Sequence, residues 1–170
     1  MPRLEFAAEI DAPLETVWAF HDTVESMPKI TPPQTKVRIE GTPDAMAKGV
    51  RFTLVIRQPP IFIPLRWETI ITEYEPPYRF VDEQGKGPFA FWRHEHIFER
   101  APRDRTLLRD IVTYTPPFGP LGVIADALFI RRQLNVMFLY RHAQTRRQLE
   151  RKAAFGEAMQ EQVQNTDKKG

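Results

Sequence analysis

The chain has 170 residues, of which 42% are hydrophobic and 27% charged, and its formal net charge is +2; these values are typical of one globular domain with a substantial core. It contains no cysteine, which excludes disulfides, thiolate catalysis and cysteine-based zinc sites. The N-terminal residues contain no apolar run of signal-peptide length, and no uninterrupted apolar segment is long enough to span a bilayer. We therefore expect a cytoplasmic protein without a transmembrane segment.

Alternating apolar and charged side chains predict a first strand over residues 3–10. Pro13 suits a first helical turn, and apolar residues at helical spacing predict a short helix over 13–21. A second short helical turn is expected over 23–27, before a run of prolines that disfavours regular structure. Two short helices therefore follow the first strand.

From residue 36 onward the hydrophobic period changes to two, which is typical of half-buried strands. Turns rich in Pro and Gly separate the segments. The predicted strands are 36–41, 50–57, 65–74, 79–84, 89–100 and 106–115. Six or seven strands at near-hairpin spacing indicate an antiparallel, meander-like sheet.

A long helix is predicted from Gly119 to about Lys152, because no Gly or Pro interrupts the chain after Gly122. Some 30 residues form a rod of about 45 Å, long enough to cover one face of the sheet. Its predicted apolar stripe consists of Val123, Ala127, Ile130, Leu134 and Met137, widened by Ile124, Leu128 and Phe138. A curved sheet around such a helix encloses a cavity wherever side chains do not fill it.

The helix also carries a basic surface. Its members are Arg131, Arg132, Arg141, Arg146, Arg147, Arg151 and Lys152, opposed by a single acid, Glu150. This surface is either a solvated helix face or a docking face for a partner or an anionic membrane. We expect one domain over 1–154, followed by a polar, frayed tail over 155–170.

The predicted strand over 89–100 carries the most informative side chains. Period two places Trp92, His94, His96 and Phe98 on one face, which we expect to point inward. On the last strand Asp110 shares a face with Leu108, Val112 and Tyr114. An inward aspartate among apolar residues needs a partner. The candidates are His94, His96, Arg93 and Arg109, of which Arg109 lies on the opposite face.

Four interpretations of these polar residues stay open at this stage. Asp110 and one histidine can form a structural hydrogen-bonded pair, or the group can anchor a ligand in an apolar pocket. His94 or His96 can act as a general acid or base, with Asp110 fixing the tautomer. A metal site needs a third ligand, for which Asp110 is a candidate, but no metal-binding motif is complete in the sequence, so we predict no metal and no other cofactor. Nucleotide-binding, esterase and zinc-protease motifs are absent, and no strand face combines basic and aromatic residues for nucleic acid.

Three segments resemble the helix-grip superfamily called SRPBCC or START-like. They are IDAPLETVWAFHD, ITEYEPPYRFVDEQGKGPFAFWRHEHIFER and LLRDIVTYTPPFGPLGVIADALFIRRQLNVMFLYRH, and the resemblance covers nearly all of 3–152. The second segment is similar to the ligand-binding and polyketide cyclase/dehydrase branch of this superfamily. The resemblance implies an α+β fold in which a curved antiparallel sheet wraps around a long C-terminal helix. It also implies a deep apolar cavity between the two, used by relatives to bind lipids, sterols or polyketides.

We therefore predict a non-catalytic protein that binds a small hydrophobic ligand such as a lipid or polyketide. The first alternative is a cyclase or dehydratase that uses His94 or His96 with Asp110, and the second is an interaction module that docks through the basic helix face. Nucleic acid is not expected as a partner, and peripheral membrane contact is a minor alternative. The entrance is expected near Ile61–Pro64 and the 116–122 hinge. The predicted ligand-binding residues are Trp67, Phe80, Trp92, His94, His96, Phe98, Asp110, Val112, Tyr114, Ile130, Leu134 and Met137.

Overall fold

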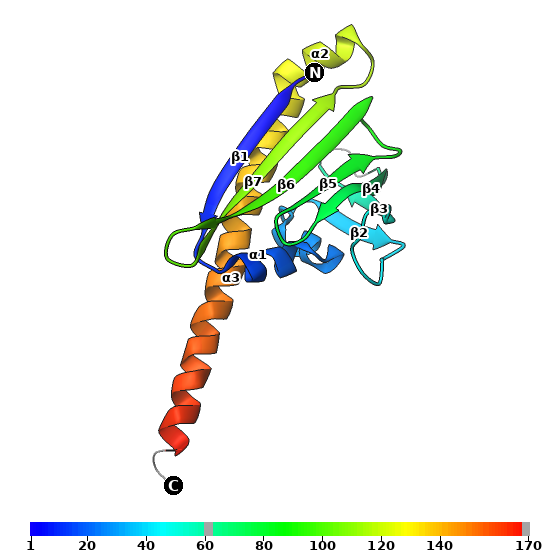
Figure 1. Ribbon diagram of the computed structural model, residues 1–170. Coiled ribbons are helices and arrows are strands. Elements are labelled where there is room, and N and C mark those ends of the chain that lie inside the picture. Colours follow the sequence, from blue (N-terminus) through cyan, green and yellow to red (C-terminus); the bar gives the residue numbers. More distant parts are fainter. Residues whose placement is uncertain (60–62, 168–170) are drawn as a thin grey trace.

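A computed structural model describes the backbone of residues 1–59 and 63–167 and the side chains of 1–59 and 63–150. Seven antiparallel strands form one curved sheet in the order β1-β7-β6-β5-β4-β3-β2 (Figure 1). The strands are β1 (Arg3–Ile10), β2 (Lys36–Glu40), β3 (Arg51–Arg57), β4 (Leu65–Glu75), β5 (Arg79–Gln84), β6 (Phe91–Ala101) and β7 (Arg105–Thr115). The predicted α+β helix-grip fold is therefore confirmed, with each predicted strand present.

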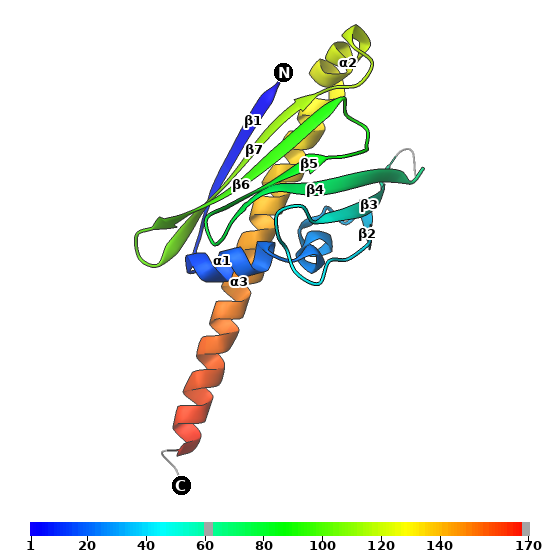
Figure 2. The ribbon, with the colours of Figure 1, turned by 45° about the vertical axis from the view of Figure 1, so that its right-hand side comes forward.

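The short helices follow β1 as predicted, although the second is longer than expected. They are α1 (Leu14–His21) and η1 (Val24–Ile30), a 3₁₀ helix that contains Pro28. Figures 1 and 2 show α1 across the end of the sheet, next to α3. Trp18 of α1 packs edge-on against Phe80 and Phe98 of the sheet, so this end of the molecule has a filled aromatic core.

The C-terminal helical region has three parts: α2 (Pro120–Ala125), the π-helical turn η2 (Asp126–Ile130) and α3 (Arg131–Asp167). The helix α3 runs along one face of the sheet and continues well beyond its end (Figure 1). Its backbone is helical to Asp167, so residues 155–167 of the segment predicted as a frayed tail are helical. Among the described residues, no helix is long and apolar enough to cross a membrane.

The predicted apolar stripe is correct only in its second half. Leu134 and Phe138 are buried, whereas Val123, Ile124 and Leu128 are 64%, 58% and 60% exposed. Ala127 is also exposed, and the prediction that these four residues face the sheet is wrong.

Two physical reasons account for this error. The π turn at Asp126–Ile130 inserts an extra residue into one helical turn, which shifts the phase of the stripe. In addition, α2 lies beyond the ends of the strands (Figure 2), where no sheet remains to cover its side chains. The buried position in this turn is Asp126, whose carboxylate accepts a 2.5 Å hydrogen bond from the Tyr114 hydroxyl.

Phe138 packs helix α3 against the sheet. Its side chain is fully buried and its ring stacks on Phe6 of β1, with centroids 4.7 Å apart. The edge of His94 from β6 approaches the same ring at 5.0 Å. The C-terminal helix is therefore packed tightly on the β1-β7-β6 side of the sheet and leaves its open space on the β2-β3-β4 side.

Candidate functional site

A cavity of about 350 Å³ lies between α3, the concave face of the sheet and the segment that follows α1. Such a volume is within the range of small-molecule sites. Its apolar wall consists of Met27, Pro32, Val37, Leu54, Ile56, Leu65, Trp67, Pro88, Phe89, Trp92, Pro117, Ile130, Leu134, Val136 and Met137. The wall is apolar because the inward positions of β2, β3 and β4 carry aliphatic and aromatic side chains in period two.

The structure divides the predicted ligand-binding residues into two groups. The residues on the cavity wall are Trp67, Trp92, His94, His96, Ile130, Leu134 and Met137. The others lie outside it: Phe80 lines a smaller neighbouring cavity, and Phe98, Asp110, Val112 and Tyr114 are buried in the sheet interior. Strand alternation identifies inward side chains but does not tell which of them face a cavity and which are covered by a helix.

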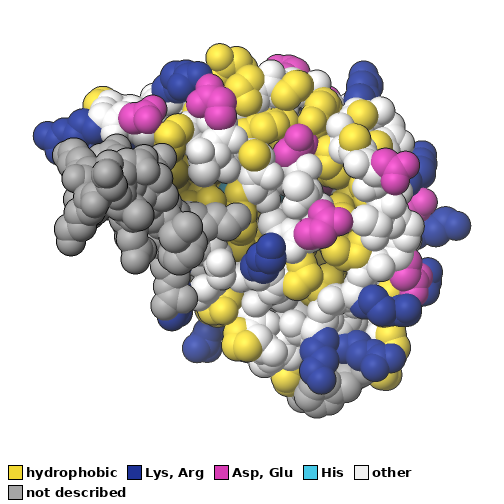
Figure 3. All heavy atoms as spheres, turned by 90° about the horizontal axis from the view of Figure 1, so that it is seen from below, with side chains coloured by type: hydrophobic (Ala, Val, Ile, Leu, Met, Phe, Trp, Pro, Cys, Tyr) yellow, Lys and Arg dark blue, Asp and Glu magenta, His cyan; other side chains and the backbone are white. Residues whose placement is uncertain are grey.

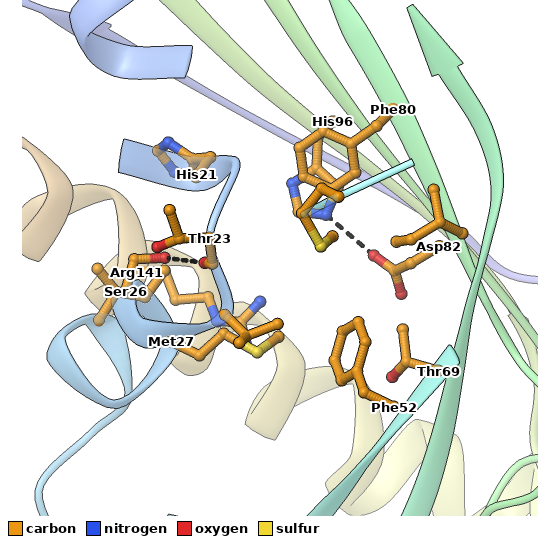
Figure 4. Close-up of a pocket in the computed structure, with 14 residues that line it drawn as sticks. His21, Thr23, Ser26, Met27, Phe52, Thr69, Phe80, Asp82, His96 and Arg141 are labelled. Atoms are coloured by element: carbon orange, nitrogen blue, oxygen red, sulfur yellow. Dashed lines mark hydrogen bonds and ion pairs between the residues drawn. The ribbon is translucent and has the colours of Figure 1, made fainter. Parts of the chain in front are cut away.

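The smaller cavity has a volume of about 40 Å³ and adjoins the first. The two share Asp82, His96 and Arg141 on their walls. Figure 4 shows these side chains around the smaller space, with the ring of His96 stacked on Phe80 at 4.0 Å. Polar groups are therefore concentrated where the two cavities meet.

Strand register brings together four polar side chains, those of Asp82, His94, His96 and Asp110. Asp82 lies directly across from His94, and His96 lies directly across from Asp110. His94 Nε2 is 2.9 Å from Asp110 Oδ1, and His96 Nε2 is 3.0 Å from Asp82 Oδ2. His94 Nδ1 is also 3.2 Å from Asp82 Oδ2. The two histidines thus lie between two buried carboxylates.

Sequence reasoning missed two members of this cluster, Asp82 and His142. His142 Nε2 is 2.5 Å from Asp110 Oδ2 and comes from α3. It continues the buried positions Leu134 and Phe138 at intervals of four residues, so extending the stripe along the helix would have found it. Asp82 shares a strand face with Phe80, but its position opposite His94 depends on a register that the sequence does not show.

The charges in the cluster stabilise one another. Burial by itself lowers the pKa of His94, but the charge of Asp82 and the hydrogen bond to Asp110 outweigh it and raise this pKa to about 9. Burial favours the neutral forms of Asp82 and Asp110, yet the histidines hold the pKa of both carboxyl groups well below its usual range. Two ionised carboxylates inside the protein therefore require positive charge beside them.

Arg141 contributes a cation that is not paired with the carboxylates of this cluster. Burial lowers the pKa of its guanidinium, while Asp110 and Asp82 act in the opposite direction. Its Nε atom is buried and has no hydrogen-bond partner within the described part of the chain. The side chain lies over the Phe138 ring at 5.5 Å and faces both cavities, so a donor-rich group remains available to a ligand.

The predicted basic helix face is smaller than the sequence indicates. Arg141 points inward to the cavities, Arg146 donates to the backbone oxygen of Glu9 at 2.9 Å, and Arg131 donates to Asp126 at 3.2 Å. The side chains of Arg151 and Lys152 lie outside the described residues. Two members of the face, Arg131 and Arg146, therefore have polar contacts within the molecule, and a third, Arg141, faces the cavities.

The predicted entrance falls partly outside the described residues, since Ile61 and Phe62 are not among them. Ile63 is 72% exposed and Pro117 lines the cavity. Figure 3 views the molecule from below, where apolar side chains gather near the middle and Lys and Arg lie mostly around the edge. The entrance near residues 61–64 stays a prediction.

Solved structures with the same fold include three bacterial proteins. A protein from Chromobacterium violaceum is 10% identical with a TM-score of 0.68, covering 87% of this chain and 96% of its own. A protein from Mycobacterium smegmatis is 16% identical with a TM-score of 0.67, covering 86% and 90%. A START superfamily protein from Mycobacterium smegmatis is 14% identical with a TM-score of 0.66, covering 88% and 97%.

These likenesses establish the fold, since identities this low carry no further information. No curated protein matches the chain at a significant level. The family model described as polyketide cyclase/dehydrase and lipid transport matches residues 10–141, a span that includes strands β2 to β7 and the part of α3 lining the cavity. Family and fold together support a role in hydrophobic ligand binding. The chain belongs to the polyketide cyclase/dehydrase and lipid transport family.

Proposed function

We propose that this protein binds one hydrophobic ligand that carries an anionic group, such as a fatty acid, in the cavity between α3 and the sheet. The observation that carries the proposal is an apolar cavity of about 350 Å³ with Arg141 on its wall. The family description, which includes lipid transport, agrees with a ligand of this class.

The apolar walls supply most of the affinity. Aliphatic and aromatic side chains from β3, β4 and β6 face α3 across the cavity, among them Leu54, Trp67 and Trp92. Each 100 Å² of apolar ligand surface buried against them contributes about 2.5 kcal/mol. The edge-to-face contact of Trp67 and Trp92 at 4.9 Å keeps this wall rigid, which reduces the ordering cost of binding.

Arg141 selects the head group. A guanidinium offers donors in a fork that matches a carboxylate or phosphate, and within the described residues Arg141 forms no ion pair with an acidic side chain. Burial makes an unpaired cation costly, so an anionic ligand gains from pairing with it. The histidines that contact Asp82 and Asp110 offset part of the negative charge of these carboxylates and so reduce their repulsion of the ligand.

The test compares two ligands of equal chain length, dodecanoate and dodecanol, by isothermal titration calorimetry. We expect one molecule of dodecanoate per chain and at least tenfold tighter binding than for the alcohol. Arg141→Met should remove that preference while retaining the apolar contact, and Arg132→Met, which changes an exposed arginine of the same helix, should keep it. Equal affinities of the wild type for acid and alcohol would refute the role of Arg141, and no binding of either would refute the function.

A second candidate function is a cyclase or dehydratase acting on a polyketide-like substrate, favoured by the position of His94 and His96 on the cavity wall. In that reaction His94, whose pKa is raised by the charge of Asp82 and the hydrogen bond to Asp110, would donate a proton and His96 would relay it. A short β-hydroxyacyl thioester should then lose a proton from Cα and its β-hydroxyl as water, and this dehydration should be lost in His96→Gln. Turnover that persists in this variant rules the reaction out.

A further inference from the structure

Three potential ligand atoms converge at the junction of the two cavities. Asp82 Oδ2 lies 3.0 Å from His96 Nε2 and 3.2 Å from His94 Nδ1, and all three atoms lie within 4.8 Å of one another. Ligand atoms bound to one Zn²⁺ at about 2.0–2.2 Å are about 3.0–3.5 Å apart. The two distances from the aspartate oxygen therefore match two edges of a metal coordination shell.

The outer nitrogens of both histidines point to Asp110. Its Oδ1 atom is 2.9 Å from His94 Nε2 and 3.0 Å from His96 Nδ1, and its Oδ2 atom accepts a hydrogen bond from His142 Nε2. Histidines that bind metals commonly donate their other N–H to a carboxylate, which fixes tautomer and ring orientation. One buried carboxylate here serves both rings and is itself held by a third histidine.

Hydrogen bonding alone leaves this cluster unsatisfied. His96 is 92% buried, and its Nδ1 atom has no hydrogen bond of acceptable geometry among the described residues. If neutral His96 donates from Nε2 to Asp82, its Nδ1 lone pair faces the Asp110 oxygen. If both rings carry a second proton, two cations lie with centroids 3.8 Å apart and repel each other.

A divalent ion removes both difficulties. Bound to Nδ1 of His94 and Nε2 of His96, it leaves each ring neutral with its remaining N–H directed to Asp110. It also places two positive charges between the carboxylates of Asp82 and Asp110. The ion thus gives a partner to His94 Nδ1 and His96 Nε2, and the remaining nitrogens lie 2.9 and 3.0 Å from Asp110 Oδ1.

We propose that Asp82, His94 and His96 form a site for a divalent transition-metal ion of the Zn²⁺, Fe²⁺ or Co²⁺ class, with its remaining coordination positions open to the cavity. Two imidazoles and one carboxylate suit these ions, and three protein ligands leave room for water or a ligand oxygen. The third ligand considered from the sequence is Asp110, whereas the structure brings Asp82 of the neighbouring strand to the two rings. The proposal does not depend on the fatty-acid ligand, since metal binding is measured without it.

The test uses the full chain after removal of bound metal by a chelator. Titration with Co²⁺ should give visible absorption bands of a low-symmetry nitrogen and oxygen site, saturating at one ion per chain, and Zn²⁺ should displace it. His96→Gln and Asp82→Asn should each weaken Zn²⁺ binding by at least 100-fold. Asp110→Asn, which alters only the orientation of the rings, should weaken it by about 10- to 100-fold.

His21→Gln is the matched control, because it removes a histidine that donates to Val17 and lies outside the cluster; its Zn²⁺ affinity should equal that of the wild type. Circular dichroism identifies variants that fail to fold, and the wild-type titration decides the question without them. Absence of Co²⁺ absorption at 1 mM ion would overturn the proposal. So would folded Asp82→Asn and His96→Gln variants that bind Zn²⁺ as tightly as the wild type.

Discussion

Phe138→Ala tests how the C-terminal helix is held on the sheet. The wild-type ring is fully buried, stacks on Phe6 at 4.7 Å and meets the edge of His94 at 5.0 Å. Truncation of a buried phenylalanine removes its burial energy and leaves a cavity, at a cost of about 3–5 kcal/mol. We expect a loss in the upper half of that range, because the sheet behind the ring is too rigid to collapse into the space.

Urea denaturation followed by tryptophan fluorescence measures this loss. With a dependence of about 2–3 kcal/mol per molar urea, a loss of about 4 kcal/mol lowers the midpoint by about 1.5 M. Phe129→Ala makes the same truncation nine residues earlier, where the ring is 69% exposed, and should change stability by less than about 0.5 kcal/mol. Similar losses in the two variants would refute the helix phase described here, and so would a loss below about 1 kcal/mol in Phe138→Ala.

Three further changes test other parts of the fold. Burial lowers the pKa of His21 to about 4, so the folded state resists protonation of this ring. The free energy of unfolding should therefore fall as the pH drops from about 6.5 to 4, by roughly 2 kcal/mol after allowing for partial exposure. Urea titrations at each pH should show that His21→Gln loses this dependence. Tyr114→Phe removes the hydroxyl that donates to a buried aspartate and should cost about 1–3 kcal/mol in the same assay, whereas the half-exposed Tyr78 should tolerate the change. Gly122→Ala would place a Cβ atom 1.9 Å from the Pro117 carbonyl oxygen, so the melting temperature should fall by several degrees.

Each of these three predictions has a result that would contradict it. An unchanged acid dependence in His21→Gln would mean that another group causes it. Equal effects of the two tyrosine substitutions would show that the aspartate contact adds no stability. A Gly122→Ala protein with the wild-type melting temperature would contradict the close backbone approach at the start of α2.

The strands were predictable because each is amphipathic and bounded by Pro or Gly. Period two correctly placed Trp92, His94, His96 and Phe98 inside. The sequence also indicated that Asp110 would be buried and paired with histidine, as the structure shows. Local alternation decides these orientations, and no long-range information is needed for them.

The remaining features depend on register and on helix phase. Asp82 joins the cluster only through pairing of β5 with β6, which brings it opposite His94. His142 joins because α3 crosses the sheet at Asp110. The exposure of Val123 and Leu128 follows from a π turn. No residue pattern predicts this turn, so the first half of the apolar stripe is predicted on the wrong face of the helix.

Native mass spectrometry of the purified protein tests ligand binding in the cavity most directly, when a cavity-filling variant is compared with its control. Met137→Trp places a large ring in the space that Met137 lines, and Leu139→Trp adds the same ring at a site that is 64% exposed. After incubation with dodecanoate, the wild type and Leu139→Trp should each carry one ligand molecule, and folded Met137→Trp should carry none. Equal occupancy in all three proteins, or none in the wild type, would contradict binding in this cavity.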